Sequence, residues 1–484
     1  MRSMVARSIG WSALQIVGNH GMSFIVFVIL TRLLTPAEIG VVAIALAITE
    51  VGSSLTRAGL MEALVRAENA DDEQQSTCFW FTLSSGTLFA LVAAALAGGI
   101  AELFDASVLA YVVPVLALTV PLSALSATHE ARLIRRFDFR SLAVRGFLGT
   151  VAGGLVGVWM AMQGYGVWSL VAQRAAVLFV SMALVWRADP WLPALNASAS
   201  ALRDLLSQGI PIGLVTFLYA MNYRLFEIVL GLFFGPAVVG YLKTATRTLD
   251  VAFQFAIGPF TSVALPTFSR LQGEPEALKR AVMSFFHISG MIALPILVSV
   301  GILASDLIPI ALGQRWSKSG ELLAILSCTA LPLLMQSVAF PTLQATGRSV
   351  LSVYAYTFSL VAGLLLAVIA APYGVSAVAF SMVLKSLLMV PILSWLINRY
   401  VGIDLRTQLA AVRLPLVTSL ILGFCLLGAL HAYPVNNALP RLVGLAAFSL
   451  FVYGVIIAVI YRGQLGARLR LTFARAKAYL GGSE

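Results

Sequence analysis

Residues 30–51, LTRLLTPAEIGVVAIALAITEV, are repeated in outline at residues 230–251, LGLFFGPAVVGYLKTATRTLDV. Each stretch reads as a Pro/Gly turn followed by an apolar segment long enough to cross a membrane as a helix. At a constant offset of 200 the matched pairs are Leu30/Leu230, Pro36/Pro236, Ala37/Ala237, Gly40/Gly240, Ala45/Ala245 and Val51/Val251. The pattern predicts that one helical unit occurs twice in the chain.

A second pair of turns extends this repeat. GYGVWSLV at 164–171 matches PYGVSAVA at 372–379, at an offset of 208. Each unit holds six predicted spans, an even number, so both copies enter the membrane in the same direction, as in transporters that rock two halves about a central site. Chance similarity between apolar segments is the alternative, and the Pro and Gly matches at turns weigh against it.

The whole chain is too apolar for a soluble globule. Of its 484 residues 60% are hydrophobic and 11% are charged, and the mean hydropathy is +0.93, whereas soluble domains are about 25% charged. Apolar blocks of about 20 residues recur along the chain, the length that a membrane-spanning helix needs. We expect an all-α polytopic membrane protein with about fourteen spans, at approximately 9–33, 39–60, 77–101, 107–128, 142–162, 165–186, 208–231, 237–262, 281–303, 320–345, 349–370, 374–397, 413–432 and 440–461.

These spans divide the chain into four parts. An N-terminal six-helix lobe (1–190) is joined by a cytoplasmic linker (191–207) to a C-terminal six-helix lobe (208–400), and residues 401–484 add two transmembrane helices and a basic cytoplasmic tail. The first apolar block lacks a small-residue cleavage site, so we expect it to remain as the first span rather than to be removed as a signal peptide.

The distribution of Lys and Arg between the spans indicates the orientation. Most of the cations fall on one side, and those assigned to the opposite side are Arg32, Arg315, Lys318 and Arg441. By the positive-inside rule both termini are cytoplasmic. The net charge of +11 is therefore mainly a topology signal, and no nucleic-acid partner is expected.

Catalytic and metal-binding patterns are missing from the sequence. Cys78, Cys328 and Cys425 lie far apart, the four histidines are equally scattered, and the chain contains no HExxH, Walker or GxSxG motif. Neither a disulfide framework nor a metal site has the spacing that it needs. We expect no catalytic residues, no metal and no cofactor, and therefore not an enzyme.

Five cations lie inside the predicted spans and away from their ends, and they are Arg174, Arg224, Lys243, Arg247 and Lys385. Cations at the span ends, such as Arg57, are counted with the topology charges. A charged side chain near the bilayer centre costs about 2.5 to 3.5 kcal/mol on insertion scales, so such residues should face a cavity, a partner or a substrate. Helical spacing places Lys243 and Arg247 on one face, and Arg174 and Lys385 fall at nearly equivalent positions of the two repeats. Together they suit a diphosphate, because Arg offers a fork of donors and Lys a compact charge.

Three acids share these spans, and Glu50 and Asp250 are matched in the repeat while Glu227 lies one turn from Arg224. A low-dielectric environment favours the neutral form of a carboxyl group, so all three are candidates for ion or proton coupling. Glu50, which has no cation within one turn, is the best candidate. Alternatively, Arg224 with Glu227, and Arg247 with Asp250, are ion pairs that hold the helices in register.

Four motifs resemble a known family: LTRLLTPAEIGVVAIALAI (30–48), RLIRRFDFRSLAVR (132–145), YGVWSLVAQ (165–173) and LPTFSRLQ (265–272). They are similar to the bacterial Wzx-like oligosaccharide flippases of the multidrug/oligosaccharidyl-lipid/polysaccharide (MATE-like) exporter superfamily, closest to the exopolysaccharide and colanic-acid branch. The relatives often carry Asn-x-Asp before the turn that corresponds to Gly235-Pro236, whereas this chain has Asn222, Arg224 and Glu227 and no Asp. We therefore assign the role of the relatives' Asp to no residue of this chain.

The resemblance implies a MATE-like fold of two six-helix lobes followed by two further helices. It implies transport, by alternating access across the bacterial inner membrane, of a polyprenyl-diphosphate-linked oligosaccharide repeat unit for exopolysaccharide or lipopolysaccharide synthesis. The partners that it implies are this lipid-linked saccharide, membrane lipids and a polysaccharide polymerase and export machinery.

Two other function classes stay open. A MATE-type drug or cation antiporter would have a cavity dominated by carboxylates, whereas here five cations within the spans oppose three acids. A membrane polysaccharide polymerase or ligase would have a substantial outer loop with catalytic residues, and the longest outer connector, about 304–319, offers only Asp306, Arg315 and Lys318. The charge balance and the short loops favour the flippase.

Overall fold

The computed structural model describes residue 18 and residues 21–57, 59–67, 71–432 and 438–460. Within these ranges the chain forms helices, turns and one extended connector, and no strand. The helices are Gly21–Leu33, α2 (Pro36–Arg57), α3 (Leu60–Arg66), α4 (Asp72–Leu103), α5 (Leu109–Ala117), α6 (Thr119–Arg135), α7 (Phe139–Met162), α8 (Val167–Ala188), α9 (Ala199–Phe234), α10 (Pro236–Arg270), α11 (Pro275–Ile302), α12 (Ala304–Leu312), η1 (Gln314–Trp316), α13 (Ser317–Ser327), α14 (Ala330–Ala345), α15 (Val350–Ala370), η2 (Ala371–Tyr373), α16 (Val375–Val401), α17 (Leu405–Ala432) and α18 (Ala438–Ile460).

The predicted all-helical polytopic fold is confirmed. Eleven helices of the described ranges are long and apolar enough to cross a membrane, or up to 13 if each bent pair of helices is one span, which is compatible with the fourteen predicted. One predicted span, 320–345, consists of α13 and α14, which meet at a bend of 58°. The first predicted span is described only from Gly21, and the basic tail beyond residue 460 lies outside the described residues.

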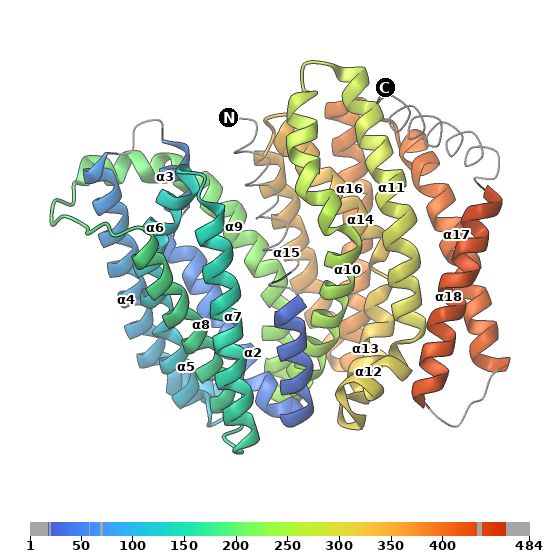
Figure 1. Cartoon of the computed structure of the whole chain (residues 1–484), viewed down its shortest axis with the longest axis horizontal. Coiled ribbons are helices and arrows are strands. Elements are labelled where there is room, and N and C mark those ends of the chain that lie inside the picture. Colours follow the sequence, from blue (N-terminus) through green and yellow to red (C-terminus); the bar gives the residue numbers. More distant parts are fainter. Residues whose placement is uncertain (1–17, 19–20, 58, 68–70, 433–437, 461–484) are drawn as a thin grey trace, which may run out of the picture.

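Figure 1 shows two groups of helices side by side, which we call the first lobe (α2 to α8) and the second lobe (α9 to α16). Helices α17 and α18 lie at the outer edge of the second lobe. Between the lobes runs α9, which packs on α3 and α4 as well as on α2, α10 and α15. The extended connector ends at Ser198, so residues 199–207, predicted as linker, are the first turns of α9.

The lobes touch most closely where α2 crosses α10. A Cβ atom added at Gly40 would overlap the carbonyl oxygen of Pro236, and one added at Gly240 would overlap that of Pro36. The contact is reciprocal at the residues that the sequence repeat pairs. Only glycine lets the two backbones approach so closely, so the small residues at this turn are explained by a symmetric crossing of the two repeats.

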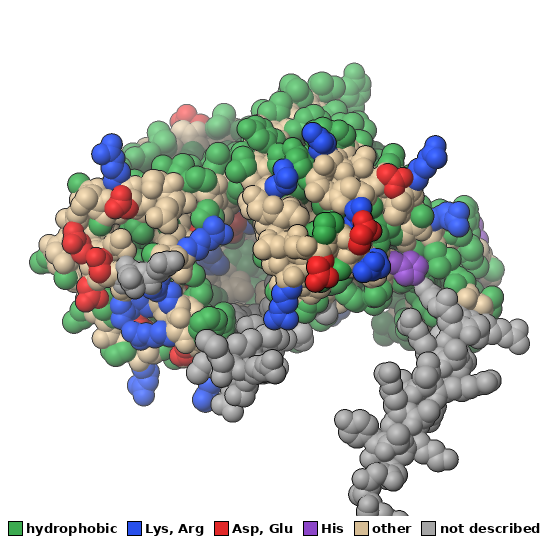
Figure 2. All heavy atoms as spheres, turned by 90° about the horizontal axis from the view of Figure 1, so that it is seen from above, with side chains coloured by type: hydrophobic (Ala, Val, Ile, Leu, Met, Phe, Trp, Pro, Cys, Tyr) green, Lys and Arg blue, Asp and Glu red, His purple; other side chains and the backbone are tan. Residues whose placement is uncertain are grey.

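The end of the molecule at which α2 begins is closed by further bonds between distant segments. Arg32 donates to the carbonyl oxygens of Ala311 (2.7 Å) and Ile310 (2.8 Å), and the Trp316 indole donates to that of Thr31 (2.8 Å). At the opposite end, the surface is hollowed between the two lobes, with basic side chains on both sides of the hollow (Figure 2). The space between the lobes is therefore open at one end only.

The connector after α8 is anchored to the first lobe by Asp189, whose buried carboxylate accepts from Arg132 Nε (2.6 Å) and Arg136 Nη1 (2.8 Å). His129 Nδ1 lies 3.1 Å from the Asp189 carbonyl oxygen, and the Arg132 guanidinium lies 4.8 Å from the Trp191 ring centroid. Burial acts to raise the pKa of Asp189, but the hydrogen bond and charges from the two arginines outweigh it and lower that pKa. The Asp189 carboxylate thus holds α6 against the connector.

Candidate functional site

A network of four charged side chains from α2, α9 and α10 joins the two lobes. Arg224 of α9 donates from Nε to Glu50 Oε2 of α2 at 2.9 Å, and a second bond to the same oxygen comes from its Nη2. Its Nη1 donates to both carboxylate oxygens of Glu227, at 2.8 and 2.9 Å. Lys243 of α10 completes the network with a 2.9 Å bond from Nζ to Glu227 Oε1.

The network is electrically balanced, because two cations meet two carboxylates. Glu227 is buried, and its side chain is 6% exposed against 39% for Glu50. A buried carboxylate needs such partners, since removing one partner of a buried pair leaves an uncompensated charge. Arg224, Glu227 and Lys243 were predicted from the sequence as charges within the spans, and the structure brings them together. The tie of Arg224 to Glu50 was not predicted.

The other predicted cations have no carboxylate bound to them. Arg247 donates from Nη2 to the Ser23 hydroxyl at 2.7 Å, not to Asp250. Arg174 of α8 makes no hydrogen bond or ion pair in the described part of the chain, although it lies within electrostatic range of Glu50, Arg57 and Arg224. No carboxylate at hydrogen-bond distance therefore neutralises the charge of these two arginines, in contrast to Arg224.

Lys385 and Asp250 are not bonded to the charge network. Lys385 Nζ is 5.2 Å from the centroid of the Phe226 ring, and its stem packs on Gly363, where an added Cβ would lie 2.9 Å from Cδ. The structure does not bring Lys385 beside Arg174, so its assignment to a diphosphate stays a prediction. Asp250 has no ion-pair partner among the described residues. Among the cations, Lys243 and Arg247 interact with it most strongly through electrostatics.

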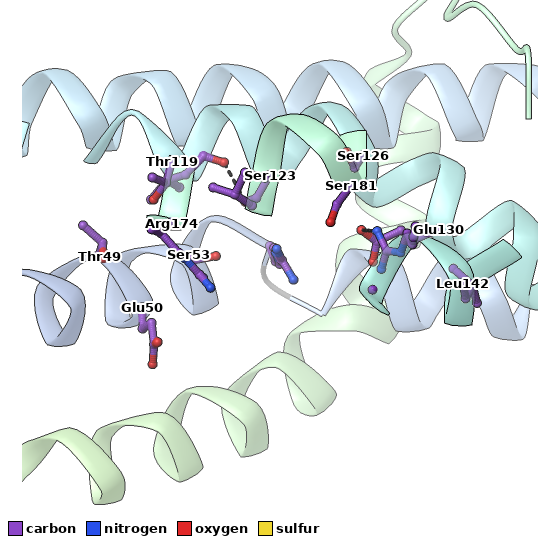
Figure 3. A pocket seen from close by; sticks show the side chains of 15 residues that line it. Thr49, Glu50, Ser53, Thr119, Ser123, Ser126, Glu130, Leu142, Arg174 and Ser181 are labelled. Atoms are coloured by element: carbon purple, nitrogen blue, oxygen red, sulfur yellow. Dashed lines mark hydrogen bonds and ion pairs between the residues drawn. The ribbon is translucent and has the colours of Figure 1, made fainter. Parts of the chain in front are cut away.

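A cavity of about 350 Å³ opens inside the first lobe between α2, α6, α7 and α8. Its wall is rich in hydroxyl groups, from Thr49, Ser53, Thr119, Ser123, Ser126 and Ser181, and its charged residues are Glu50, Arg57, Glu130, Arg145 and Arg174. Figure 3 shows Arg174 beside Ser53, while Glu50 points from α2 toward the neighbouring helix. The cavity thus adjoins the charge network through Glu50.

The charges in this cavity differ in their pairing. Arg145 donates to Glu130, so that pair is neutral. Arg57, at the last turn of α2, has no hydrogen-bond partner among the described residues, and its buried Nε is unpaired. Arg57 and Arg174 therefore remain as cations that no carboxylate bonds. Their donors suit an anionic oxygen ligand, and the hydroxyls around them suit a ligand rich in hydroxyl groups.

Sequence reasoning missed Arg57, which it interpreted as a cytoplasmic topology charge. The signal that would have found it is the spacing of Glu50, Ser53 and Arg57, which are three and four residues apart and so share one face of an apolar helix. A polar stripe on a membrane-spanning helix marks a face turned to water or ligand. No group of His, Cys, Asp or Glu side chains in the described ranges is arranged to hold a metal ion.

Comparison with known proteins gives matches in sequence and in structure. The profile of the family described as "Polysaccharide biosynthesis protein" matches residues 29–321. The succinoglycan biosynthesis transport protein ExoT of Rhizobium meliloti (strain 1021) is 25% identical over 489 residues, which cover 98% of this chain and 96% of that protein. The lipopolysaccharide biosynthesis protein WzxC of Escherichia coli (strain K12) is 21% identical over 337 residues, 68% of this chain and 67% of its own length.

Solved structures share the fold. The lipid II flippase MurJ, in an inward closed conformation, superposes with a TM-score of 0.75 at 12% identity and covers 94% of this chain and 99% of its own. An inward-facing multidrug resistance MATE family transporter of the MOP superfamily gives a TM-score of 0.57 at 15% identity, over 82% of this chain and 98% of its own. At these identities the likeness concerns the fold alone, and it confirms the predicted MATE-like architecture.

Proposed function

The chain belongs to the polysaccharide biosynthesis protein family, and from this premise we propose that it is a flippase that moves a polyprenyl-diphosphate-linked oligosaccharide repeat unit across the membrane. The proposal draws on ExoT, a relative whose name describes transport, and on a flippase of the same fold. It assigns the chain to transport rather than to enzyme catalysis. The polar cavity between helices gives a saccharide a hydrated path, while the polyprenyl tail stays in lipid.

One observation carries the assignment of the headgroup. Arg57 and Arg174 line a hydroxyl-rich cavity of about 350 Å³ and have no carboxylate bonded to them. An unpaired arginine in a low-dielectric site is costly, and a diphosphate would supply the missing counter-charge through bidentate bonds. We assign these two arginines to the diphosphate, with Arg247 of the second lobe as a further cation that no carboxylate bonds.

Arg224 and Lys243 are less available to a diphosphate than Arg57 and Arg174. Their donors are already engaged by Glu50 and Glu227, so a diphosphate would have to displace a carboxylate to reach them. Such an exchange links binding to the lobes, because Glu50 belongs to α2 and Arg224 to α9. A ligand that draws Arg224 away from Glu50 would loosen the two lobes from one another.

Glu50 is also the carboxylate that we assign to energy coupling. Protonation would remove one of the two acids that hold Arg224 and would weaken the same tie between the lobes. Asp250 and Glu227 are the other candidates, and Asp250 occupies the matched position of the second repeat. Under this assignment Glu50→Gln still binds the lipid-linked substrate but loses the stimulation of flipping by a pH gradient in liposomes. If Glu50→Gln keeps this stimulation, Glu50 does not couple flipping to the gradient, and Asp250, another ion or the membrane potential supplies the coupling.

The chain is a multi-pass membrane protein, and we propose that it lies in the bacterial inner membrane with both termini cytoplasmic. The basic side chains that border the hollow between the lobes support this orientation (Figure 2), because cytoplasmic loops carry an excess of Lys and Arg. The hollow would then open to the cytoplasm, where the lipid-linked saccharide is made. A polysaccharide polymerase and export machinery would take the product on the other side.

Mass spectrometry of the lipid that co-purifies with the active protein tests the proposal. We expect a polyprenyl diphosphate that carries a saccharide. Reproducible recovery of active protein without any such lipid would contradict the proposed substrate. Recovery of a bound organic cation instead would favour the antiporter that the MATE-like fold also allows.

A further inference from the structure

Four aromatic rings gather on the second lobe beside the charge network. Tyr219 and Tyr223 of α9 have ring centroids 4.9 Å apart, and the Tyr356 ring of α15 lies 5.8 Å from that of Tyr219. Phe340 of α14 stacks on Tyr356 at 4.6 Å with an interplanar angle of 20°. A 3.0 Å bond from Asn222 Nδ2 to the Tyr356 carbonyl oxygen holds α9 and α15 in register. The rings are thus held by three helices.

The tyrosines are exposed although they lie midway along membrane-spanning helices. Tyr219 is 47% exposed and Tyr223 is 50% exposed, and both belong to α9, which packs between α2, α10 and α15. Asp250 of α10 lies within electrostatic range of Tyr223. A tyrosine hydroxyl turned to hydrocarbon would lack a partner, and tyrosines that face lipid gather at the membrane surfaces instead. We conclude that these rings border the polar space between the helices.

Tyr219, Tyr223 and Glu227 are spaced four residues apart, so they form one stripe along α9. Each step of four residues is about 6 Å along the helix axis, close to the length of a sugar ring. The stripe runs from the aromatic rings to the carboxylate that binds Arg224 and Lys243. The cavity that contains Arg57 and Arg174 adjoins this network through Glu50, which is bonded to Arg224. A ligand whose diphosphate lies in that cavity would therefore extend its sugars past the network toward the tyrosines.

We propose that Tyr219, Tyr223 and Tyr356 form a stacking platform for pyranose rings of the carried saccharide. The proposal rests on the proposed function and adds a site for the sugars. Pyranose rings present C–H groups on their faces, which are attracted to the negative face of an aromatic ring. The phenol hydroxyls and Asp250 supply hydrogen-bond partners for the sugar hydroxyls. Such a platform tolerates different sugars, because it recognises ring faces rather than one pattern of hydroxyl groups.

The test measures binding of synthetic polyprenyl diphosphates that carry no sugar, one hexose or two hexoses to the purified full chain in nanodiscs. Tyr219→Ala and Tyr223→Ala should each weaken binding of the sugar-bearing lipids about tenfold and leave binding of the sugar-free lipid unchanged. Tyr219→Phe and Tyr223→Phe, which keep the ring, should retain most of the affinity. The matched control is Tyr354→Ala, because Tyr354 is 68% exposed on the same helix as Tyr356 and has no ring partner in the described structure.

The outcomes separate the platform from the flippase assignment. Equal losses for sugar-free and sugar-bearing lipids would overturn the platform and make the tyrosines structural. Equal affinity of the unaltered protein for all three lipids would overturn it as well. A protein that binds none of the diphosphate lipids would overturn the proposed function itself, independently of the tyrosine variants.

Discussion

The cations of the membrane-spanning helices fall into two sets that differ in their pairing with carboxylates. Arg224 and Lys243 are bonded to Glu50 and Glu227, so their charge is neutralised and they join α2, α9 and α10. Arg57 and Arg174 line a cavity in the first lobe without a carboxylate of their own. The difference teaches that a charge inside a membrane helix does not by itself mark a ligand site.

The same contrast holds for the two acids that the repeat pairs. Glu50 is bonded to Arg224, whereas Asp250 has no ion-pair partner within the described ranges. The backbone crossing at Gly40 and Gly240 is reciprocal, so the symmetry of the helices is kept while the symmetry of the charges is lost. A transporter of an asymmetric substrate has reason to differ in this way between its lobes.

Removing the acid at the centre of the paired set should have the largest effect. Glu227→Gln leaves Lys243 without its carboxylate in a buried site, and we expect a loss of about 3 to 5 kcal/mol in the free energy of unfolding. Thermal unfolding of the purified protein in detergent measures it. The control is Glu276→Gln, which removes an exposed ion pair with Lys279 and should change little. Equal stability of the two variants would show that the bonds of Glu227 do not stabilise the packing of α9 on α10.

Separating α2 from α10 should have the next largest effect. Gly40→Ala places a Cβ against the Pro236 carbonyl oxygen, and such overpacking costs about 1 to 3 kcal/mol. We expect the closed end to open, so that a cysteine introduced at the buried Leu34 reacts faster with a membrane-impermeant thiol reagent. Gly98→Ala is the control, because a Cβ there meets open space. Unchanged reactivity in Gly40→Ala would contradict the role of the crossing in closing this end.

Asp189 offers a smaller effect, which appears only in acid. Because the pKa of Asp189 is lowered in the folded protein, its contribution to stability is fully present above the unfolded pKa of about 3.9 and is lost as the pH falls through the lower folded value. The unfolding temperature of the unaltered protein should therefore drop below about pH 4. Asp189→Asn should lack this component of the drop and start from a lower stability at neutral pH. If the unfolding temperature of Asp189→Asn falls in acid as much as that of the unaltered protein, the drop arises from other carboxylates.

Much of the fold could be predicted from the sequence, because apolar blocks, turn residues and the repeat are local patterns. The span 320–345 was still predicted as one helix, since hydropathy does not report the 58° bend between α13 and α14. The short helix α12 was interpreted as part of a loop. These misses concern breaks within apolar stretches, where composition changes little.

The site could be predicted only in part, because charge compensation is a property of three-dimensional contacts. The sequence was enough to identify Arg224, Glu227 and Lys243 as charges within the spans. The bond from Arg224 to Glu50 joins residues 174 positions apart and depends on how the lobes dock. For the same reason Arg57 was taken as a topology charge, although it lines the cavity with Arg174.

The central claim is that the unpaired cations, rather than the paired ones, hold the diphosphate. The direct measurement is the affinity of the full chain in nanodiscs for sugar-free polyprenyl diphosphate, compared between the double variant Arg57→Gln, Arg174→Gln and the single variant Lys243→Gln. Two lost charge-assisted hydrogen bonds predict a drop of about a hundredfold or more for the double variant, and a much smaller drop for Lys243→Gln. Unchanged affinity of the double variant, or a larger loss for Lys243→Gln, would contradict the account.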